Sequence, residues 1–171
     1  KGLFRQMAAE LELVQLSNEP MHYRRFPLVY LVEAADDICY QIMDVEDGHK
    51  LKILSDAETE GLFLQFFDPR EDDQTLEYIH STLSMVSDAN ERIAFLRAMV
   101  IGKLTRECAK QFMDRLGQLE TLDSIVPLFK SLPEVSKLAM DQVKRISIEK
   151  LYNDRSVIEI EIAGYKILGT L

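Results

Sequence analysis

The sequence contains no tryptophan and little glycine or proline, with seven glycines and five prolines among 171 residues. No low-complexity linker interrupts the chain, and no internal repeat is present, which argues against a solenoid. The two cysteines, Cys39 and Cys108, lie far apart without the paired spacing of a zinc site or a disulfide framework. We therefore expect a cytoplasmic protein that works in a reducing compartment.

Long apolar runs and an excess of basic residues are also absent. Acidic or basic residues interrupt every apolar run before it reaches about 18 residues, the length that a membrane-spanning helix needs. The formal net charge of −9 disfavours a broad nucleic-acid-binding surface, which requires clustered Lys and Arg. The first residues, Lys-Gly-Leu-Phe-Arg, lack an initiator Met and do not resemble a signal peptide, so we interpret the start as an internal cut.

The apolar residues, 47% of the sequence, are numerous enough for one core. Most of them recur at intervals of three and four residues, which is the spacing of amphipathic helices. We expect an all-α fold, an irregular multi-helix domain formed by residues 1–171. Capping residues, prolines and glycines delimit predicted helices at about 1–17, 27–48, 55–67, 72–83, 87–119 and 131–152.

Several local patterns support these boundaries. Ser55 and Glu58 have the spacing of a capping box, and Ser131 and Glu134 repeat it. Gly48 is a plausible C-terminal stop for the second helix. The tail at 157–165 alternates apolar and acidic residues, which taken alone favours a strand and a turn.

Two predicted helices carry clear apolar stripes. In the fifth, one stripe predicts a central packing element: Ile93, Leu96, Val100, Leu104, Cys108 and Phe112. In the second, the predicted stripe includes Leu28, Leu31, Val32, Ala35, Cys39 and Ile42.

The second predicted helix also carries Asp36, Tyr40 and Asp44, spaced four residues apart on one helical face. Asp36 and Tyr40 border the stripe that contains Val32 and Cys39, where we expect limited solvent access. A carboxylate in that position needs a cation or hydrogen-bond donors. Alternatively, the face is a solvated acidic surface made of Asp36, Asp37, Asp44, Glu46 and Asp47, with Tyr40 as an ordinary boundary aromatic.

Three short runs extend this pattern: Arg-Phe-Pro-Leu at 25–28, Tyr-Leu-Val-Glu-Ala-Ala-Asp-Asp-Ile-Cys-Tyr at 30–40, and Asp-Val-Glu-Asp at 44–47. Together they resemble the deoxyguanosinetriphosphate triphosphohydrolase-like proteins of the HD superfamily, in their C-terminal part. The resemblance continues more loosely through 96–101 and 161–168. It implies that the tail is helical despite its alternation.

The resemblance implies a metal-dependent enzyme that converts a deoxynucleoside triphosphate to a deoxynucleoside and triphosphate. By residue-to-residue match, Asp36 is a ligand of a divalent metal, Mg²⁺ or Mn²⁺, and Tyr40 and Asp44 contact the sugar of the substrate. A metal of this kind polarises a phosphoryl oxygen or activates a bound water. Members of the family commonly form symmetric multimers, so a homo-oligomer is implied as well.

The family's other metal ligands, a His and an adjacent His-Asp pair, have no match here. The histidines are His22, His49 and His80, none is followed by Asp, and we expect surface or boundary positions for them. Phe26 also stands where the family pattern Arg-His-Pro-Leu has a His, a departure that removes none of these ligands. We therefore expect a fragment with an incomplete active site that is inactive alone.

Arg24, Arg25 and Arg97 receive no assigned role. A second interpretation of the whole chain remains open, in which it is a non-catalytic module for oligomerisation through 87–119 or for regulatory nucleotide binding.

Overall fold

The computed structural model of the chain describes residues 2–119 and 126–170. Within these ranges there are seven α-helices, a 3₁₀ helix, a π-helical segment and one two-stranded sheet, so the prediction of an all-α fold is confirmed. In chain order the elements are α1 Gly2–Glu10, β1 Gln15–Asn18, β2 Met21–Tyr23, α2 Val29–Lys50, α3 Asp56–Leu64, α4 Asp73–Met85, α5 Ala89–Leu119, η1 Leu128–Ser131, α6 Glu134–Ile146, η2 Ser147–Leu151 and α7 Arg155–Leu168.

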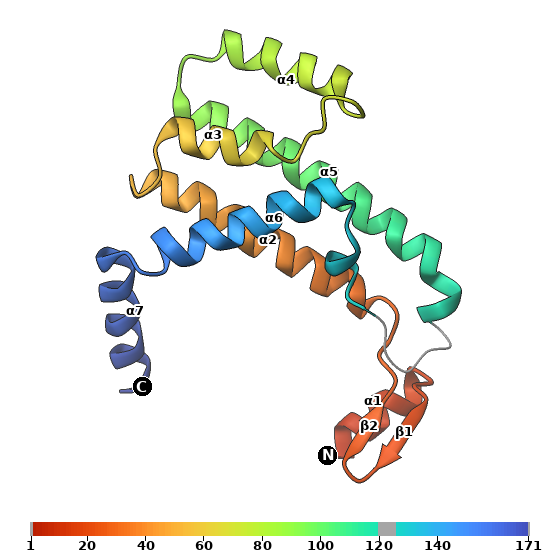
Figure 1. Cartoon of the computed structure of the whole chain (residues 1–171). Helices are drawn as coiled ribbons and strands as arrows, with labels where there is room; N and C mark the ends of the chain where they lie inside the picture. The colour runs from red at the N-terminus through yellow and green to blue at the C-terminus, as the bar shows by residue number, and fades with distance from the viewer. Residues whose placement is uncertain (1, 120–125, 171) are drawn as a thin grey trace.

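The core lies where α2 and α5 pack side by side, with α6 and η1 against α2 and with α3 against α5 (Figure 1). All six residues of the stripe predicted for α5 are buried, from Ile93 at 1% exposure to Phe112 at 7%. The prediction that this helix is the central packing element is thus confirmed. Its 31 residues contact α2, α3 and η1.

The face that α2 buries differs from the predicted one. The buried apolar residues are Tyr30, Ala34, Ile38, Ile42 and Val45, whereas Val32 and Cys39 are exposed. A helix with apolar residues on more than half of its circumference offers two possible stripes, and helical periodicity does not choose between them. The contacts of α2 with α5 and α6 determine which stripe is buried.

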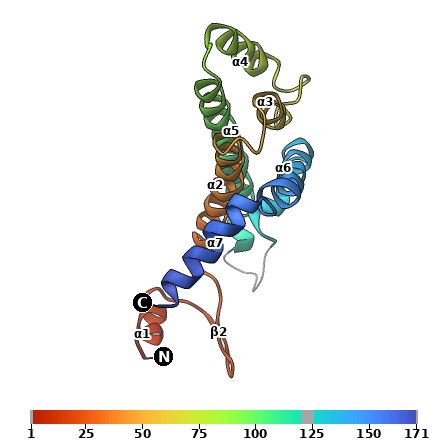
Figure 2. The same ribbon diagram turned by 90° about the vertical axis from the view of Figure 1, so that its left-hand side faces the viewer.

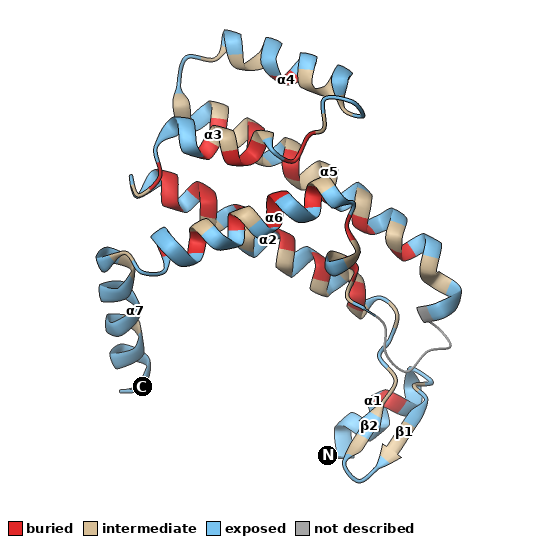
Figure 3. Ribbon diagram, in the orientation of Figure 1, coloured by how far each residue is buried: buried red, intermediate tan, exposed pale blue. Residues whose placement is uncertain are grey.

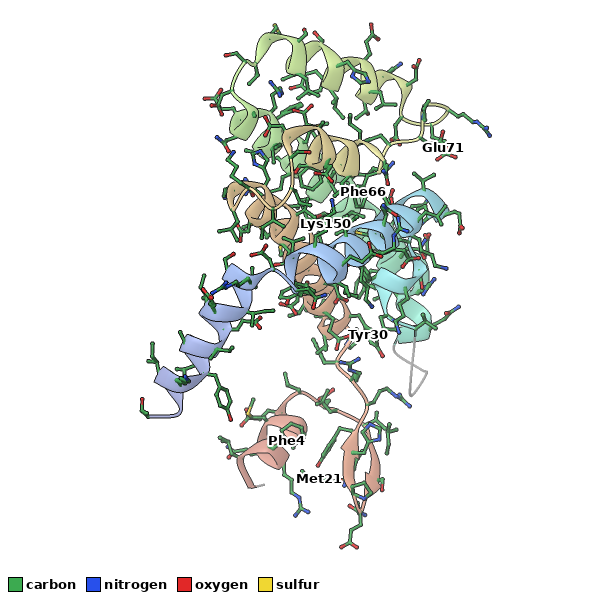
Figure 4. All side chains as sticks on the ribbon, turned by 60° about the vertical axis from the view of Figure 1, so that its left-hand side comes forward. Phe4, Met21, Tyr30, Phe66, Glu71 and Lys150 are labelled. Carbon is green, nitrogen blue, oxygen red and sulfur yellow. The ribbon has the colours of Figure 1, made fainter. Side chains whose placement is uncertain are left out.

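The N-terminal segment also departs from prediction. The helix expected at 1–17 ends at Glu10, and a short antiparallel hairpin follows, in which Asn18 pairs with Met21. The turn at 18–20 that was expected to stop a helix instead joins two strands. The ring of Tyr23 lies edge-on to Phe4 with 5.6 Å between ring centroids, and Figure 4 shows Phe4 and Met21 in this small unit, apart from Tyr30 at the near end of α2.

The C-terminal α7 is helical, as the resemblance implies and contrary to the alternating pattern. The helix extends away from the packed helices in both views (Figures 1 and 2). It has no buried residue, and Figure 3 colours almost the whole helix as exposed. In the part of the chain that the structure describes, no helix has the length and apolar character needed to cross a membrane.

The structure confirms one of the two predicted capping boxes and contradicts the other. The capping box predicted at Ser55 and Glu58 is confirmed, because both reciprocal hydrogen bonds form. The one predicted at Ser131 is wrong, since Pro133 precedes α6 and no side chain caps it. The Ser131 hydroxyl instead accepts a hydrogen bond from Arg115 at 2.8 Å and donates to the carbonyl of Pro127.

Gly48 does not end α2 as predicted but lies buried inside it. A Cβ at this position overlaps the buried side chain of Leu151 and lies 3.3 Å from Cδ1 of Leu54. The missing side chain therefore allows η2 to approach α2 closely. This contact places the segment after η2 beside the C-terminal half of α2.

Replacing Gly48 with alanine is expected to lower the free energy of unfolding by about 1–3 kcal/mol, because the added methyl group must displace Leu151. Urea-induced unfolding followed by circular dichroism measures the change. Gly61→Ala is the matched control, since a Cβ at this α3 position meets nothing within 4 Å. Equal stability of the two variants would contradict the close contact.

Candidate functional site

The candidate site lies on the face of α2 that points away from the core. Asp36 and Tyr40 are exposed, Tyr40 to 61%, and Asp44 is half-buried. The expectation of limited solvent access at Asp36 and Tyr40 is wrong for this chain, because the buried stripe of α2 lies on the opposite side. Residues spaced four apart still share one line along the helix, so the structure keeps the three side chains together on an open surface.

Tyr152 joins this face from a distant part of the sequence. Its hydroxyl donates a hydrogen bond to Oδ2 of Asp44 at 2.6 Å, across 108 residues of chain. The π-helical segment η2 ends immediately before it, and π-helical turns are frequent at functional sites. Sequence reasoning missed Tyr152, since no local pattern links it to α2.

Burial and hydrogen bonding set the protonation of this pair. Partial burial raises the pKa of the Asp44 carboxyl, the hydrogen bond from Tyr152 lowers it, and the nearby charge of Asp47 raises it. Burial, followed by hydrogen bonds with Asp44 and Tyr40, raises the pKa of Tyr152 well above its usual value of 10. At neutral pH, Tyr152 is therefore a neutral hydroxyl that donates to Asp44.

A hollow of about 310 Å³ adjoins the N-terminal half of this face and is lined by Asp36 together with Arg25, Glu33 and Asp37. Arg25 forms an ion pair with Glu33, and its guanidinium carbon lies 5.3 Å from the centroid of the Tyr30 ring. The hollow thus combines an exposed carboxylate with a fixed cation. Arg25, to which the sequence assigned no role, lies within reach of an anion bound beside Asp36.

The described part of the chain holds no group of three or more His, Cys, Asp or Glu residues that would bind a metal. Asp36 contributes one carboxylate, which is a single ligand. The histidines do not add to it: His22 and His80 are exposed as expected. His49 is instead buried, contrary to expectation, with Nε2 2.8 Å from Oδ1 of Asp56.

Glu46 and Arg97 have structural roles. Glu46, which the alternative interpretation assigned to a solvated face, is only 5% exposed. Its carboxylate pairs with Arg97 at 2.6 Å and with Lys50 at 3.1 Å. A buried carboxylate needs such partners, so this cluster ties α2 to α5 and removes Glu46 from the solvated face. Asp36, Tyr40 and Asp47 remain exposed there, and Asp44 is half-buried.

Comparison with curated proteins identifies relatives along nearly the whole chain. It is 33% identical over 169 residues to a deoxyguanosinetriphosphate triphosphohydrolase-like protein of Pseudomonas aeruginosa, covering 99% of this chain and 37% of that protein. A protein of the same name from Synechocystis is 30% identical, with 100% and 36% covered. The deoxyguanosinetriphosphate triphosphohydrolase of Salmonella paratyphi A is 27% identical, with 87% and 31% covered.

The chain is a relative of the deoxyguanosinetriphosphate triphosphohydrolases. The resemblance read from residues 25–47 is thereby confirmed. The chain spans about a third of the length of the curated triphosphohydrolases that it matches. No family model matches it.

Replacing Asp44 with asparagine in this triphosphohydrolase relative is expected to change how stability depends on pH. Burial raises the folded-state pKa of Asp44 above the unfolded value of 3.8, so the folded chain holds this proton more tightly. The stabilisation is complete below pH 3.8 and is lost as the pH rises through the folded-state pKa.

The stability of Asp44→Asn relative to the wild-type protein should therefore increase from below pH 3.8 toward neutral pH. Thermal unfolding of both proteins across this range measures the difference. A relative stability that decreases over the same range would contradict burial as the dominant influence on this carboxyl.

Proposed function

We propose that this chain supplies one side of the active site of a metal-dependent deoxynucleoside triphosphate triphosphohydrolase of the HD superfamily. The reaction converts the substrate to a deoxynucleoside and triphosphate, and the chain alone is inactive. The observation that carries the proposal is the open line of Asp36, Tyr40 and Asp44 on α2, in a chain whose relatives bear the name of that enzyme. dGTP is the substrate that those names indicate.

Asp36 is the residue proposed to hold the divalent metal, Mg²⁺ or Mn²⁺. Its carboxylate is exposed and lines a hollow, which suits an oxygen ligand that completes a site built by other donors. The described residues contribute a single such ligand, so the fit is that of a shared site. When bound, the metal supplies charge stabilisation at the phosphoryl group and an activated water.

Arg25 is placed to act on the phosphates. It lines the same hollow as Asp36, and its guanidinium is held between Glu33 and the ring of Tyr30. A planar guanidinium binds phosphate oxygens in a bidentate manner. A triphosphate that runs along α2 from Asp36 toward the helix start therefore meets a cation at its far end.

Tyr40, Asp44 and Tyr152 are proposed to bind the sugar. Tyr152 donates to one oxygen of Asp44, which holds the carboxylate in place and leaves its other oxygen to accept from a sugar hydroxyl. The exposed ring of Tyr40 provides an apolar surface for the sugar. A ring in that position also leaves little room for a 2′-hydroxyl, so we propose that it selects deoxyribose over ribose.

The apolar stripe of α5 is buried within the chain. The alternative of oligomerisation through residues 87–119 would therefore use the other side of that helix, where Met113 is exposed. The apolar side chains on α7, Ile160 and Ile162 among them, are exposed and available for such contacts.

Replacing Asp36 with asparagine in the full-length protein is expected to lower Mn²⁺-dependent release of triphosphate from dNTPs by at least a hundredfold, since second-shell losses alone cost roughly 10–100-fold. The isolated chain should show no activity. Chromatography of the products for all four dNTPs, with dGTP first, provides the measurement.

Glu77→Gln is the matched control, because Glu77 is an exposed carboxylate on α4, outside α2 and the proposed line. It should retain wild-type activity. An inert full-length protein, or full activity in Asp36→Asn, would remove the catalytic proposal.

Replacing Tyr152 with phenylalanine deletes the hydroxyl that orients Asp44. We expect kcat/KM to fall about tenfold, the amount corresponding to one hydrogen bond to a charged group, with little change in melting temperature. Tyr78→Phe, an exposed tyrosine on α4, serves as the control. Unchanged kinetics in Tyr152→Phe would show that the bond to Asp44 has no part in turnover.

A further inference from the structure

A strip of apolar side chains lies exposed on α2, beside the line of polar site residues. The strip consists of Leu28, which precedes the first residue of α2, together with Val32, Cys39 and Met43. Val32 is 69% exposed. Successive residues of a helix are about 100° apart, so the whole strip lies within about 80° of Asp36, on the side away from Asp44. A contiguous exposed apolar surface of this kind marks a contact site.

The C-terminal α7 carries a second exposed apolar surface, since none of its 14 residues is buried. Its charged side consists of Arg155, Glu159 and Lys166, which lie within about 40° of one another around the helix. Its opposite side consists of Val157, Gly164 and Leu168, with Glu161 at the edge. Leu168 is 74% exposed. A helix that is apolar around most of its circumference is normally covered by another part of a protein.

The chain enters α7 beside the polar line of α2. Tyr152 donates its hydrogen bond to Asp44, and residues 153 and 154 alone separate it from the first residue of α7. At the other end of the line, the hollow of Asp36 is lined by Arg25, which precedes α2. Both views show α7 and the N-terminal unit of α1, β1 and β2 projecting from the packed helices on the same side (Figures 1 and 2). The line therefore lies between the points where these two units are attached.

The two apolar surfaces agree in length and in register. A helix rises about 1.5 Å per residue, so α7 spans about 21 Å and the strip from Leu28 to Met43 spans about 22 Å. When α7 runs back along α2 from the bond between Tyr152 and Asp44, the two helices are antiparallel. Equal numbers of residues from that bond bring three pairs to the same level: Val157 with Cys39, Gly164 with Val32, and Leu168 with Leu28. The apolar side of α7 then meets the strip along its whole length.

We propose that α7 is a lid that turns about residues 153 and 154 and packs along the apolar strip of α2. Closure buries both apolar surfaces, which is favourable in water, and leaves the charged side of α7 in solvent.

Closure also changes the shape of the site. The other flank of the line, at Asp37 and Gln41, borders a hollow shared with η1 and α6. The closed lid is therefore the second wall of a cleft, with the line of Asp36 and Tyr40 at its floor. Ligand sites are concave, and a lid that closes over one excludes water from the reaction. This effect on turnover rests on the proposed function, whereas the closure itself does not.

The exposed thiol of Cys39 provides the test, because Cys108 is buried. Val157→Cys places a second thiol at the same level, on the side of α7 that faces the strip. We expect oxidised glutathione to form a disulfide within one chain of the full-length protein, at a protein concentration low enough to disfavour contacts between chains. Mass spectrometry of the linked peptides identifies it. A disulfide joins Cα atoms no more than about 7 Å apart, so it reports direct packing of α7 on the strip.

Glu159→Cys is the matched control, because it lies two residues further along α7 on the charged side, and neither substitution replaces a buried residue. Its bond to Cys39 should form at least tenfold more slowly. Equal rates in the two variants, or no bond in either, would overturn the closure. A bond that forms only between two chains would overturn it as well, because a second copy would then cover α7.

The cross-linked Val157→Cys protein should release triphosphate from dGTP at least tenfold more slowly than its reduced form, since a locked lid prevents substrate entry and product release. Reduction with dithiothreitol should restore the rate. Unchanged turnover in the cross-linked protein would show that α7 does not close over the substrate face. If the full-length protein is inert in both forms, the proposed function fails, and the cross-linking rates still decide whether α7 closes.

Discussion

The packing of α2 against α5 is the interaction on which the rest of the structure depends. Ile42 and Val45 of α2 and Leu96 and Val100 of α5 are among the most deeply buried residues, and each buried side chain of this size contributes about 1.5–3 kcal/mol. The Glu46–Arg97 ion pair joins the same two helices. This contact directs the opposite face of α2, with the row of Asp36, Tyr40 and Asp44, away from the core.

A second contact makes that row part of a composite site. Gly48 allows Leu151 to pack against α2, and the next residue, Tyr152, then bonds to Asp44. Close approach and hydrogen bonding reinforce one another here, because the backbone must come near before a tyrosine hydroxyl reaches the carboxylate. The same arrangement places η1 and α6 beside α2.

Sequence patterns predicted the elements that depend on local structure or on one dominant stripe. The six-residue stripe of α5 and the capping box at Ser55 are confirmed. The hairpin at 15–23 was missed, since its strands are too short for a clear alternation. The capping pattern was also present at Ser131, but the Ser131 hydroxyl forms hydrogen bonds with Arg115 and Pro127 and does not cap α6.

By itself, the sequence determined an all-α chain, a relationship to the deoxyguanosinetriphosphate triphosphohydrolases, and a row of Asp36, Tyr40 and Asp44 on one helical face. These follow from spacing along a helix and from a motif of consecutive residues. Tertiary structure alone decided which face of α2 is buried and that Tyr152 joins Asp44. The physical reason is that these contacts join helices far apart in sequence, where packing and not periodicity selects the partners.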